Sequence, residues 1–251
     1  MNRASFRFYA NLNDFIPAER RQIRFQHEFL GRPAVKDVLE ALGTPHTEID
    51  LILINDESTS FERRLADGDQ VSVYPRFKQI DLRKLTNVRP PELGEIRFVL
   101  DTHLGRLAGY LRMLGFDSLY WNDADDQRIA EASATDGRIV LTRDRGLLKR
   151  KSVAYGYYVR RTDPRKQILE VMNRFDLRNS VHEFKRCIRC NGLVEPIAKV
   201  EVIQRLPARV AERQRDFRRC MDCEQVYWQG SHYERMQSLI ESLTAVGGHS
   251  L

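Results

Sequence analysis

The sequence predicts an α+β domain, then an α/β domain in which a parallel sheet is flanked by helices, and finally a small metal-binding module. Three observations support this prediction. Two strand patterns, a helix pattern and further strand patterns come first; strands alternate with helices from residue 96; and four cysteines form two close pairs. Alternating strands and helices are typical of a parallel sheet, and paired cysteines are typical of zinc ligands.

The elements of the first domain follow from its hydrophobic periods. SFRFYANL (5–12) and RQIRFQHEF (21–29) alternate apolar and polar residues, which predicts two half-buried strands paired as a hairpin. RPAVKDVLEALG (32–43) places its apolar residues on one helical face and ends in glycine. Two further strands are predicted, in IDLILIND (49–56) and after the DGD turn (67–69).

The predicted domain boundaries follow from composition. Residues 1–82 form the first domain, and residues 83–95 combine charge, two prolines and a glycine, which is typical of a linker. Residues 96–180 form the α/β domain, and residues 181–251 form the metal-binding module with a C-terminal helix. The strands predicted in the α/β domain are 98–100, 118–121, 139–142 and 153–159.

Two predicted strands of the α/β domain lead to an aspartate, Asp101 and Asp144. Parallel sheets bind ligands beyond the carboxyl ends of their strands, so both carboxylates are expected at one crevice. Asp126, or its neighbour Asp125, begins a helix and is expected to join them. Clustered carboxylates repel one another unless a divalent cation neutralises them, and oxygen ligands suit Mg²⁺ or Mn²⁺. This pattern indicates metal-dependent phosphodiester hydrolysis.

Asp144 has a second interpretation, because an aspartate at a strand–helix junction is a common helix cap. The two interpretations are compatible, since one carboxylate can cap a helix and bind a metal ion. Arg143 and Arg145 flank Asp144 and are placed to meet phosphate. His103, two residues after Asp101, has an imidazole suited to proton transfer, but a structural or exposed role is the alternative.

The cysteine pairs are Cys187 with Cys190 and Cys220 with Cys223, and 29 residues lie between them. Two such pairs supply four thiolates for tetrahedral Zn²⁺ and leave no open coordination position, so the predicted zinc is structural. A redox pair and disulfides are the alternatives. A redox motif needs only one pair, and disulfides are disfavoured in the cytosol.

Positive charge is concentrated in residues 145–219, which hold 20 Lys and Arg against 8 Asp and Glu. Most of these are arginines, which suit bidentate contact with phosphate, so nucleic acid is favoured over a merely solvated face. The arginines near the second cysteine pair that are expected to contact the backbone are Arg213, Arg215, Arg218 and Arg219. Tyr227, Trp228 and Tyr233 either stack on unpaired bases or close the core of the module.

The order of these motifs resembles a known family. FVLDTHLGRLAGYLRMLGFD, DDQRIAEASATDGRIVLTRDRGLLKR and the cysteine-paired segment are similar to the Mut-seven C-terminal (Mut7-C) RNase family, a PIN-like nuclease group. The stretch before them, with LADGDQVSVYP near its end, resembles the ubiquitin-like β-grasp domains of sulfur carriers. The resemblance implies a β-grasp domain, a PIN-like domain and a zinc ribbon.

The resemblance further implies a metal-dependent ribonuclease. On the family pattern, Asp101, Asp126 and Asp144 hold Mg²⁺ or Mn²⁺, with Asp125 beside them, while the ribbon and its arginines bind single-stranded RNA. One alternative is a non-catalytic RNA-binding adaptor. Another is a β-grasp docking module in sulfur or cofactor metabolism with a protein partner, although this segment lacks the free Gly-Gly end of sulfur carriers.

Location is the last expectation from the sequence. No apolar run has the roughly 18 residues of a membrane helix, and the first residues lack the apolar centre of a signal peptide. A cytoplasmic protein without membrane contact is therefore expected.

Overall fold

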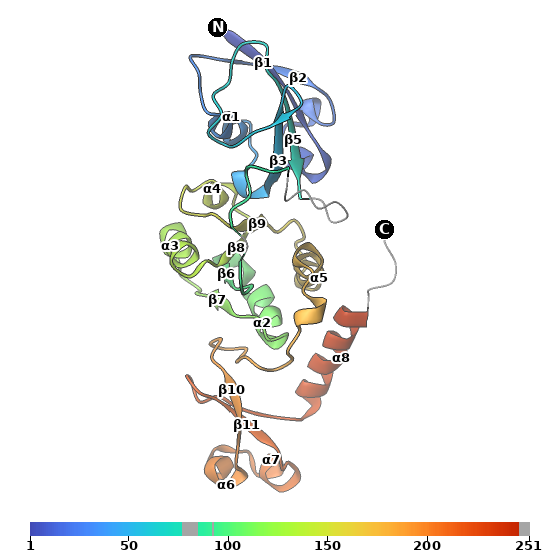
Figure 1. The fold of residues 1–251 in the computed structure, drawn as a ribbon. Helices are drawn as coiled ribbons and strands as arrows, with labels where there is room; N and C mark the ends of the chain where they lie inside the picture. Colours follow the sequence, from blue (N-terminus) through green and yellow to red (C-terminus); the bar gives the residue numbers. More distant parts are fainter. Residues whose placement is uncertain (77–84, 92, 246–251) are drawn as a thin grey trace. The chain divides into compact units, whose positions relative to one another are not determined.

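The computed structural model describes residues 1–76, 85–91 and 93–245 (Figure 1). The first two positions of the predicted linker, and residue 92 within it, lie outside the described residues. Every helix in the described ranges is too short or too polar to cross a membrane.

The chain divides into two compact units, each made of two stretches of sequence. One unit comprises Met1–Glu95 and Asp125–Tyr158, and the other comprises Ile96–Ala124 and Val159–Leu251. The division runs through the α/β domain. Its first two strands belong to the second unit, and its last two belong to the first unit together with the N-terminal domain.

A five-stranded sheet in the order β2-β1-β5-β3-β4 forms the N-terminal domain. β1 pairs antiparallel with β2, which confirms the predicted hairpin, and parallel with β5. With one helix between the second and third strands, this is the β-grasp arrangement expected from the sequence. The elements are β1 (Asn2–Phe8), β2 (Phe25–Phe29), α1 (Val35–Ala41), β3 (Ile49–Ile54), β4 (Glu57–Ser58) and β5 (Gln70–Pro75).

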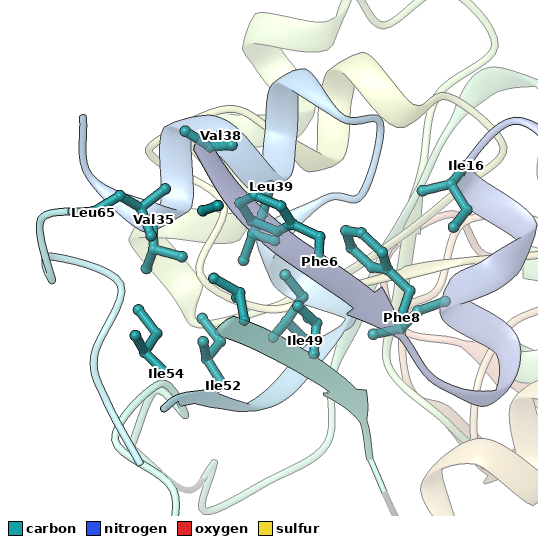
Figure 2. Close-up of a cluster of buried hydrophobic side chains, with 14 of the residues drawn as sticks. Phe6, Phe8, Ile16, Val35, Val38, Leu39, Ile49, Ile52, Ile54 and Leu65 are labelled. Atoms are coloured by element: carbon teal, nitrogen blue, oxygen red, sulfur yellow. The ribbon is translucent and has the colours of Figure 1, made fainter. Parts of the chain in front are cut away.

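The core of this domain lies between the sheet and α1 (Figure 2). Alternate residues of β1, Phe6 and Phe8, point to the same side and are fully buried, as is Ile52 of β3. Helical spacing brings Val35 and Leu39 of α1 to the same side. Burial of each such side chain stabilises the folded state by about 1.5–3 kcal/mol, so these apolar residues hold the helix against the sheet.

The first strand ends earlier than its sequence period predicts. Ala10 has φ 48°, and the amide of the Asn13 side chain donates to the carbonyls of Phe8 (2.9 Å) and Ala10 (3.0 Å). These bonds turn the chain into the 3₁₀ helix η1 (Ala10–Phe15). The prediction of a strand up to residue 12 is therefore wrong, because a side-chain bond competes with the sheet ladder.

The second sheet has the order β7-β6-β8-β9. β6 pairs parallel with β7, and β8 pairs parallel with β9, which confirms a parallel sheet flanked by helices. β6 and β8 are buried along their whole length, as central strands of such a sheet are. The elements are β6 (Phe98–Leu100), η4 (Thr102–Leu104), α2 (Gly105–Met113), β7 (Ser118–Tyr120), α3 (Asp126–Asp136), β8 (Ile139–Thr142), α4 (Arg145–Leu148), β9 (Gly156–Tyr158) and α5 (Pro164–Phe175).

The C-terminal module is an antiparallel sheet in the order β10-β11-β12 with short helices. Val202, Phe217 and Val226 form its small core, and Trp228 packs against them. This packing supports the core interpretation of Trp228. The elements are η5 (Arg178–Ser180), β10 (Val194–Ile197), α6 (Lys199–Val202), η6 (Ile203–Arg205), α7 (Ala208–Arg213), β11 (Phe217–Cys220), β12 (Val226–Trp228) and α8 (Ser231–Ala245).

Candidate functional site

The four cysteines form one cluster, in which all sulfur atoms lie within 4.8 Å of one another. Cys187 Sγ is 3.6 Å from Cys223 Sγ, and Cys190 Sγ is 3.4 Å from Cys220 Sγ. Tetrahedral zinc with Zn–S bonds of about 2.3 Å places its sulfur atoms roughly 3.8 Å apart. The thiols are free, so the cluster fits one structural zinc ion rather than disulfides.

Both cysteine pairs lie in turns with the same backbone conformation and hydrogen bond. The amide of Asn191 donates to the carbonyl of Cys187 at 2.9 Å, in the first turn. The amide of Glu224 donates to the carbonyl of Cys220 at 3.1 Å, in the second. Asn191 and Glu224 both have positive φ, 77° and 56°. Two copies of one turn therefore present two sulfur pairs to the same point.

The hydrogen bonds around the thiols favour a bound cation. Desolvation opposes ionisation of Cys187, but hydrogen bonds from the Tyr227 hydroxyl and from backbone amides outweigh it and lower its pKa to about 7. Tyr227 Oη lies 3.0 Å from Cys187 Sγ. Desolvation and the neighbouring thiols raise the pKa of Cys190 to about 12. The first thiolate forms readily, and the further ones need a metal ion to neutralise them.

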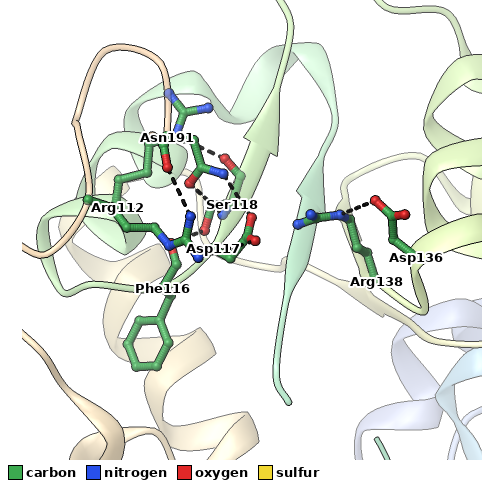
Figure 3. A network of polar contacts seen from close by, with 8 residues as sticks. Arg112, Phe116, Asp117, Ser118, Asp136, Arg138 and Asn191 are labelled. Carbon is green, nitrogen blue, oxygen red and sulfur yellow. Dashed lines mark hydrogen bonds and ion pairs between the residues drawn. The ribbon is translucent and has the colours of Figure 1, made fainter. Parts of the chain in front are cut away.

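A network of polar contacts fastens the first cysteine turn to α2 and β7 (Figure 3). The Asn191 side chain donates to Asp117 Oδ1 (2.8 Å) and accepts the amide of Ser118 (2.9 Å). Arg112, only 5 % exposed, donates to the carbonyl of Ser118 (2.9 Å) and to that of Ile188 (3.1 Å). Within this unit, the first cysteine turn is thus attached to α2 and to the start of β7.

Asp101 directly follows β6 and is buried, with 8 % of its surface exposed. The hydroxyl of Thr102 donates to its carboxylate at 3.2 Å. The hydroxyl of Tyr120 donates to the carbonyl of Thr102 at 2.8 Å, which ties this turn to β7. Asp101 thus lies at the carboxyl end of a strand of a parallel sheet, where such sheets bind ligands. His103 is exposed.

Two of the predicted aspartates cap helices in the other unit. Asp144 Oδ1 accepts the amide of Gly146 at 2.6 Å, at the start of α4. Asp125 Oδ1 accepts the amide of Arg128 at 2.8 Å, at the start of α3. The cap interpretation of Asp144 is confirmed, and its role as a metal ligand stays a prediction.

Asp126, the first residue of α3, pairs with a cation instead. Its Oδ2 lies 3.7 Å from Arg150 Nη2. Both side chains are more than a third exposed, so water screens this pair and it contributes little to stability. The two adjacent aspartates thus have different roles. Asp125 caps α3, whereas the side chain of Asp126 is partly exposed and pairs with Arg150.

The flanking arginine Arg145 is engaged with the N-terminal domain. Its guanidinium donates to the carbonyls of Phe15 and Asp14, both at 3.1 Å, and lies 5.2 Å from the centre of the Phe15 ring. It is therefore held by the β-grasp domain. The remaining predicted RNA contacts lie on the protein surface or are half-buried: Arg143, Arg213, Arg215, Arg218 and Arg219.

Within the described part of the chain, the four cysteines are the group of His, Cys, Asp or Glu residues whose ligand atoms lie close enough together, within 4.8 Å, to hold one metal ion. The three aspartates do not form a second such group there. Joint binding of a catalytic metal by Asp101, Asp126 and Asp144 therefore stays a prediction.

A family model for the Mut7-C RNAse domain matches residues 96–240. The chain belongs to this family. A second model, Mut7-C ubiquitin, matches residues 1–81. The two matches confirm the resemblances seen in the sequence. The Mut7-C match spans all the predicted aspartates and cysteines.

Two solved structures are also similar to this Mut7-C protein. The crystal structure of H. volcanii small archaeal modifier protein 1 is 21 % identical over 31 % of this chain and 100 % of its own, with a TM-score of 0.26. The crystal structure of SAMP1 from Haloferax volcanii is 20 % identical over 32 % of this chain and 100 % of its own, with a TM-score of 0.26. No curated protein sequence matches this one significantly.

Several supporting residues of the Mut7-C protein escape the sequence patterns. Asn191 directly follows a cysteine pair and adopts positive φ, which asparagine tolerates, so its position was a readable signal. Arg112 interrupts an apolar helix, which is a weaker signal of a buried polar contact. Arg150 has no local signal, because its partner Asp126 is distant in sequence.

Proposed function

We propose that this Mut7-C protein is a metal-dependent ribonuclease that cuts single-stranded RNA. Its catalytic residues are Asp101, Asp126 and Asp144, with Asp125 beside them. The observation that carries the proposal is the Mut7-C RNAse domain match over residues 96–240, since that range holds all four aspartates. The strand ends add support, because ligands of parallel sheets bind where the strands before Asp101 and Asp144 end.

The carboxylates have different surroundings, and these suit different shares of the work. Asp101 is buried, so water screens its charge less than that of an exposed carboxylate. Asp126 holds Arg150 only loosely and can exchange it for another cation. Mg²⁺ or Mn²⁺ held by these residues would supply a Lewis acid that could activate water and stabilise the leaving oxygen.

The basic residues supply the grip on the RNA backbone. Arg143 lies next to Asp144 and is assigned to the phosphates near the cut. Arg145 is held by the carbonyls of the first domain and adds positive charge from a fixed position. The arginines assigned to more distant phosphates are those of the zinc ribbon: Arg213, Arg215, Arg218 and Arg219.

The test is cleavage of end-labelled single-stranded RNA by the zinc-loaded full chain with Mg²⁺, with Mn²⁺ or with neither. Omission of these ions is preferable to a chelator, which would also remove the ribbon zinc. The wild type is compared with an Asp101→Asn, Asp144→Asn double variant purified in parallel. We expect metal-dependent cutting by the wild type and cutting at background level by the double variant.

Asparagine is the right substitution at position 144, because it caps helices about as well as aspartate and removes only the charge. Asp56→Asn is the matched control, since Asp56 is exposed in a turn at φ 67°, which asparagine tolerates. The control should cut like the wild type. RNA binding without cutting by any of the proteins would instead favour the adaptor function.

A further inference from the structure

The zinc ribbon contains a cavity of about 660 Å³ that lies outside the proposed catalytic residues. Its walls come from the three-stranded sheet, from the segment before the first cysteine and from the start of α8. This volume is in the range of small-ligand sites, roughly 300–1,000 Å³. The lining residues used below are Phe184, Lys199, Arg215, Arg218, Tyr227 and Tyr233.

The two faces of the ribbon sheet have different roles. Phe217 points to one face and joins the small core with Val202 and Val226. Arg218 is the next residue along β11, so it points to the opposite face, where it pairs across the sheet with Tyr227. Arg218 and Tyr227 line the cavity together with Phe217 and Trp228 of the core face, but they are not part of the core cluster themselves.

Aromatic rings from β12 and from α8 line the cavity. Tyr233 from α8 packs on Phe184, with ring centres 4.6 Å apart and planes tilted by 34°. The hydroxyl of Tyr227 is bonded to Cys187, so the zinc cluster fixes the position of that ring. Both tyrosines keep part of their surface exposed. Rings that are held in place and partly exposed suit stacking on a planar ligand.

Basic side chains border the same cavity. Arg215, Arg218 and Lys199 line it, and in the part of the chain that the structure describes their charged groups make no hydrogen bond or ion pair. A fourth cation, Arg186, is already bonded to the carbonyl of Asn191. Arg186 also pairs with Asp117 at 3.3 Å, so it does not add to the charge offered to a ligand. The three other cations outnumber the two acidic residues that line the cavity, so its charge favours an anion.

We propose that this cavity binds one unpaired nucleotide of an RNA strand. Its base lies against the rings of Tyr227 and Tyr233, and its neighbouring phosphates meet Arg215 and Arg218. Rings alone would suit many apolar ligands, and arginines alone would suit any polyanion. Their combination at one cavity is the recognition chemistry of a single-stranded nucleic acid. The choice of RNA rests on the proposed ribonuclease function.

The test is a binding measurement that needs no cleavage. The zinc-loaded full chain, carrying Asp101→Asn and Asp144→Asn, is titrated into a short fluorescein-labelled oligouridylate without Mg²⁺ or Mn²⁺, and anisotropy is recorded. Tyr233→Leu should weaken binding about tenfold, because stacking of one base contributes on the order of a factor of ten. Tyr233→Phe keeps the ring and should bind within about twofold of the parent.

The arginines are tested by salt dependence. Log affinity falls as log salt rises. The Arg215→Gln, Arg218→Gln double variant should make this negative slope shallower by about 1.4, since each phosphate contact on a single strand contributes about 0.7. Arg209→Gln is the matched control, because Arg209 is exposed on the same ribbon and does not line the cavity. Its slope should stay that of the parent protein.

Four competitors identify the occupant. Unlabelled oligouridylate should displace the probe well, whereas an abasic strand of equal length should displace it about tenfold less well. Inorganic polyphosphate or an acidic peptide that competes as well as the RNA would overturn the proposal. Unchanged binding by Tyr233→Leu would overturn it as well.

The fate of this proposal is separable from that of the ribonuclease. Base-dependent binding, together with no cutting by the unsubstituted protein under any metal, keeps the cavity assignment and removes the nuclease. Metal-dependent cutting, together with binding that ignores Tyr233, keeps the nuclease and removes the cavity assignment. Zinc content and circular dichroism, measured on each variant, show whether the ribbon is still folded.

Discussion

Asp144 serves a helix and is proposed to serve a metal ion with the same carboxylate. One of its oxygens accepts the amide of Gly146, and its own amide donates to the hydroxyl of Thr142. The first bond holds the Asp144 side chain, and the second holds its backbone, at the end of β8. A helix cap is therefore not evidence against catalysis, since it holds the carboxylate at the strand end where a ligand would bind.

Asp144→Ala and Asp144→Asn should separate the two roles. Alanine removes the cap and should lower the free energy of unfolding by about 1 kcal/mol, whereas asparagine should leave it nearly unchanged. Both variants should lose RNA cutting. Urea unfolding followed by circular dichroism measures the first effect. Equal destabilisation by the two variants would show that the Gly146 bond is not the source of the effect.

His27 of β2 should give the N-terminal domain a dependence on pH. Burial, and then the charge of Arg20, lower its pKa below its ordinary value of 6.5. The unfolded chain therefore binds the proton more tightly than the folded chain. The contribution of His27 to the free energy of unfolding is fully present above pH 6.5 and is lost as the pH falls through the lowered folded-state pKa. His27→Gln should lose less stability than the wild type between pH ~7.5 and pH ~5 in urea titrations.

At the scale of elements, the turn after α2 shows how closely the ribbon segment is packed. Gly115 has φ 93°, and a Cβ on it would lie 2.1 Å from the carbonyl oxygen of His182. The chain there bonds back to the helix end, since His182 donates to Leu114 (3.0 Å) and Phe184 donates to Met113 (2.9 Å). This glycine permits the close approach that leads the chain into the first cysteine turn.

Gly115→Ala should destabilise the protein by about 2 kcal/mol or more, because positive φ and a backbone clash both oppose a methyl group there. The segment before the ribbon should then become sensitive to limited proteolysis. Gly94→Ala is the control, since a Cβ on Gly94 meets nothing within 4 Å. Wild-type protease resistance in Gly115→Ala would contradict the close packing.

Element types were readable from the sequence where a hydrophobic period was long. The helix at Pro164–Phe175 follows from its apolar period, with Asp163 as cap and proline at the first turn. The strand at Phe98–Leu100 is a short apolar run that the alternation of strands and helices identifies. The 3₁₀ helix at Ala10–Phe15 was missed, because its cause is a bond from the Asn13 side chain.

Only part of the candidate site could be predicted from the sequence, because some of its contacts join residues that are far apart along the chain. Paired cysteines carry their spacing within a short stretch, so their cluster could be predicted. The contact of Arg145 with Asp14 spans 131 positions, and no local pattern reports such a contact. The ion pair of Asp126 with Arg150 is hidden in the same way. Chemistry that depends on distant partners needs the folded chain.

At the scale of the whole molecule, the zinc cluster supports one part of the fold and leaves another independent. Zinc removal should unfold the ribbon and abolish base-dependent RNA binding, while the β-grasp core around Phe6 keeps its protection. Cys223→Ser should have the same effect. Hydrogen exchange read by mass spectrometry, with zinc content measured in parallel, checks this. Uniform loss of protection across the chain would show that the units do not fold independently.

The N-terminal domain is tied to residues 145–158 by contacts within one compact unit. The ring of His46 is hydrogen-bonded to the carbonyl of Val153 at 2.9 Å, and Lys149 donates to the carbonyl of Glu40 at 2.6 Å. The described part of the predicted linker takes part, since the hydroxyl of Tyr155 donates to the carbonyl of Pro91 at 2.6 Å. The β-grasp domain is thus anchored to one half of the α/β domain.

The order of synthesis gives this anchoring a consequence in time. The carboxylate of Glu48 is 3 % exposed and accepts the amide of Tyr158, which lies 110 positions further along. At ribosomal rates, roughly 5 to 20 s pass between the two residues. During that interval the acid and the surface around it face water on the nascent chain. A protein that recognises this face of the β-grasp domain would meet it during translation, because the finished chain has already covered it.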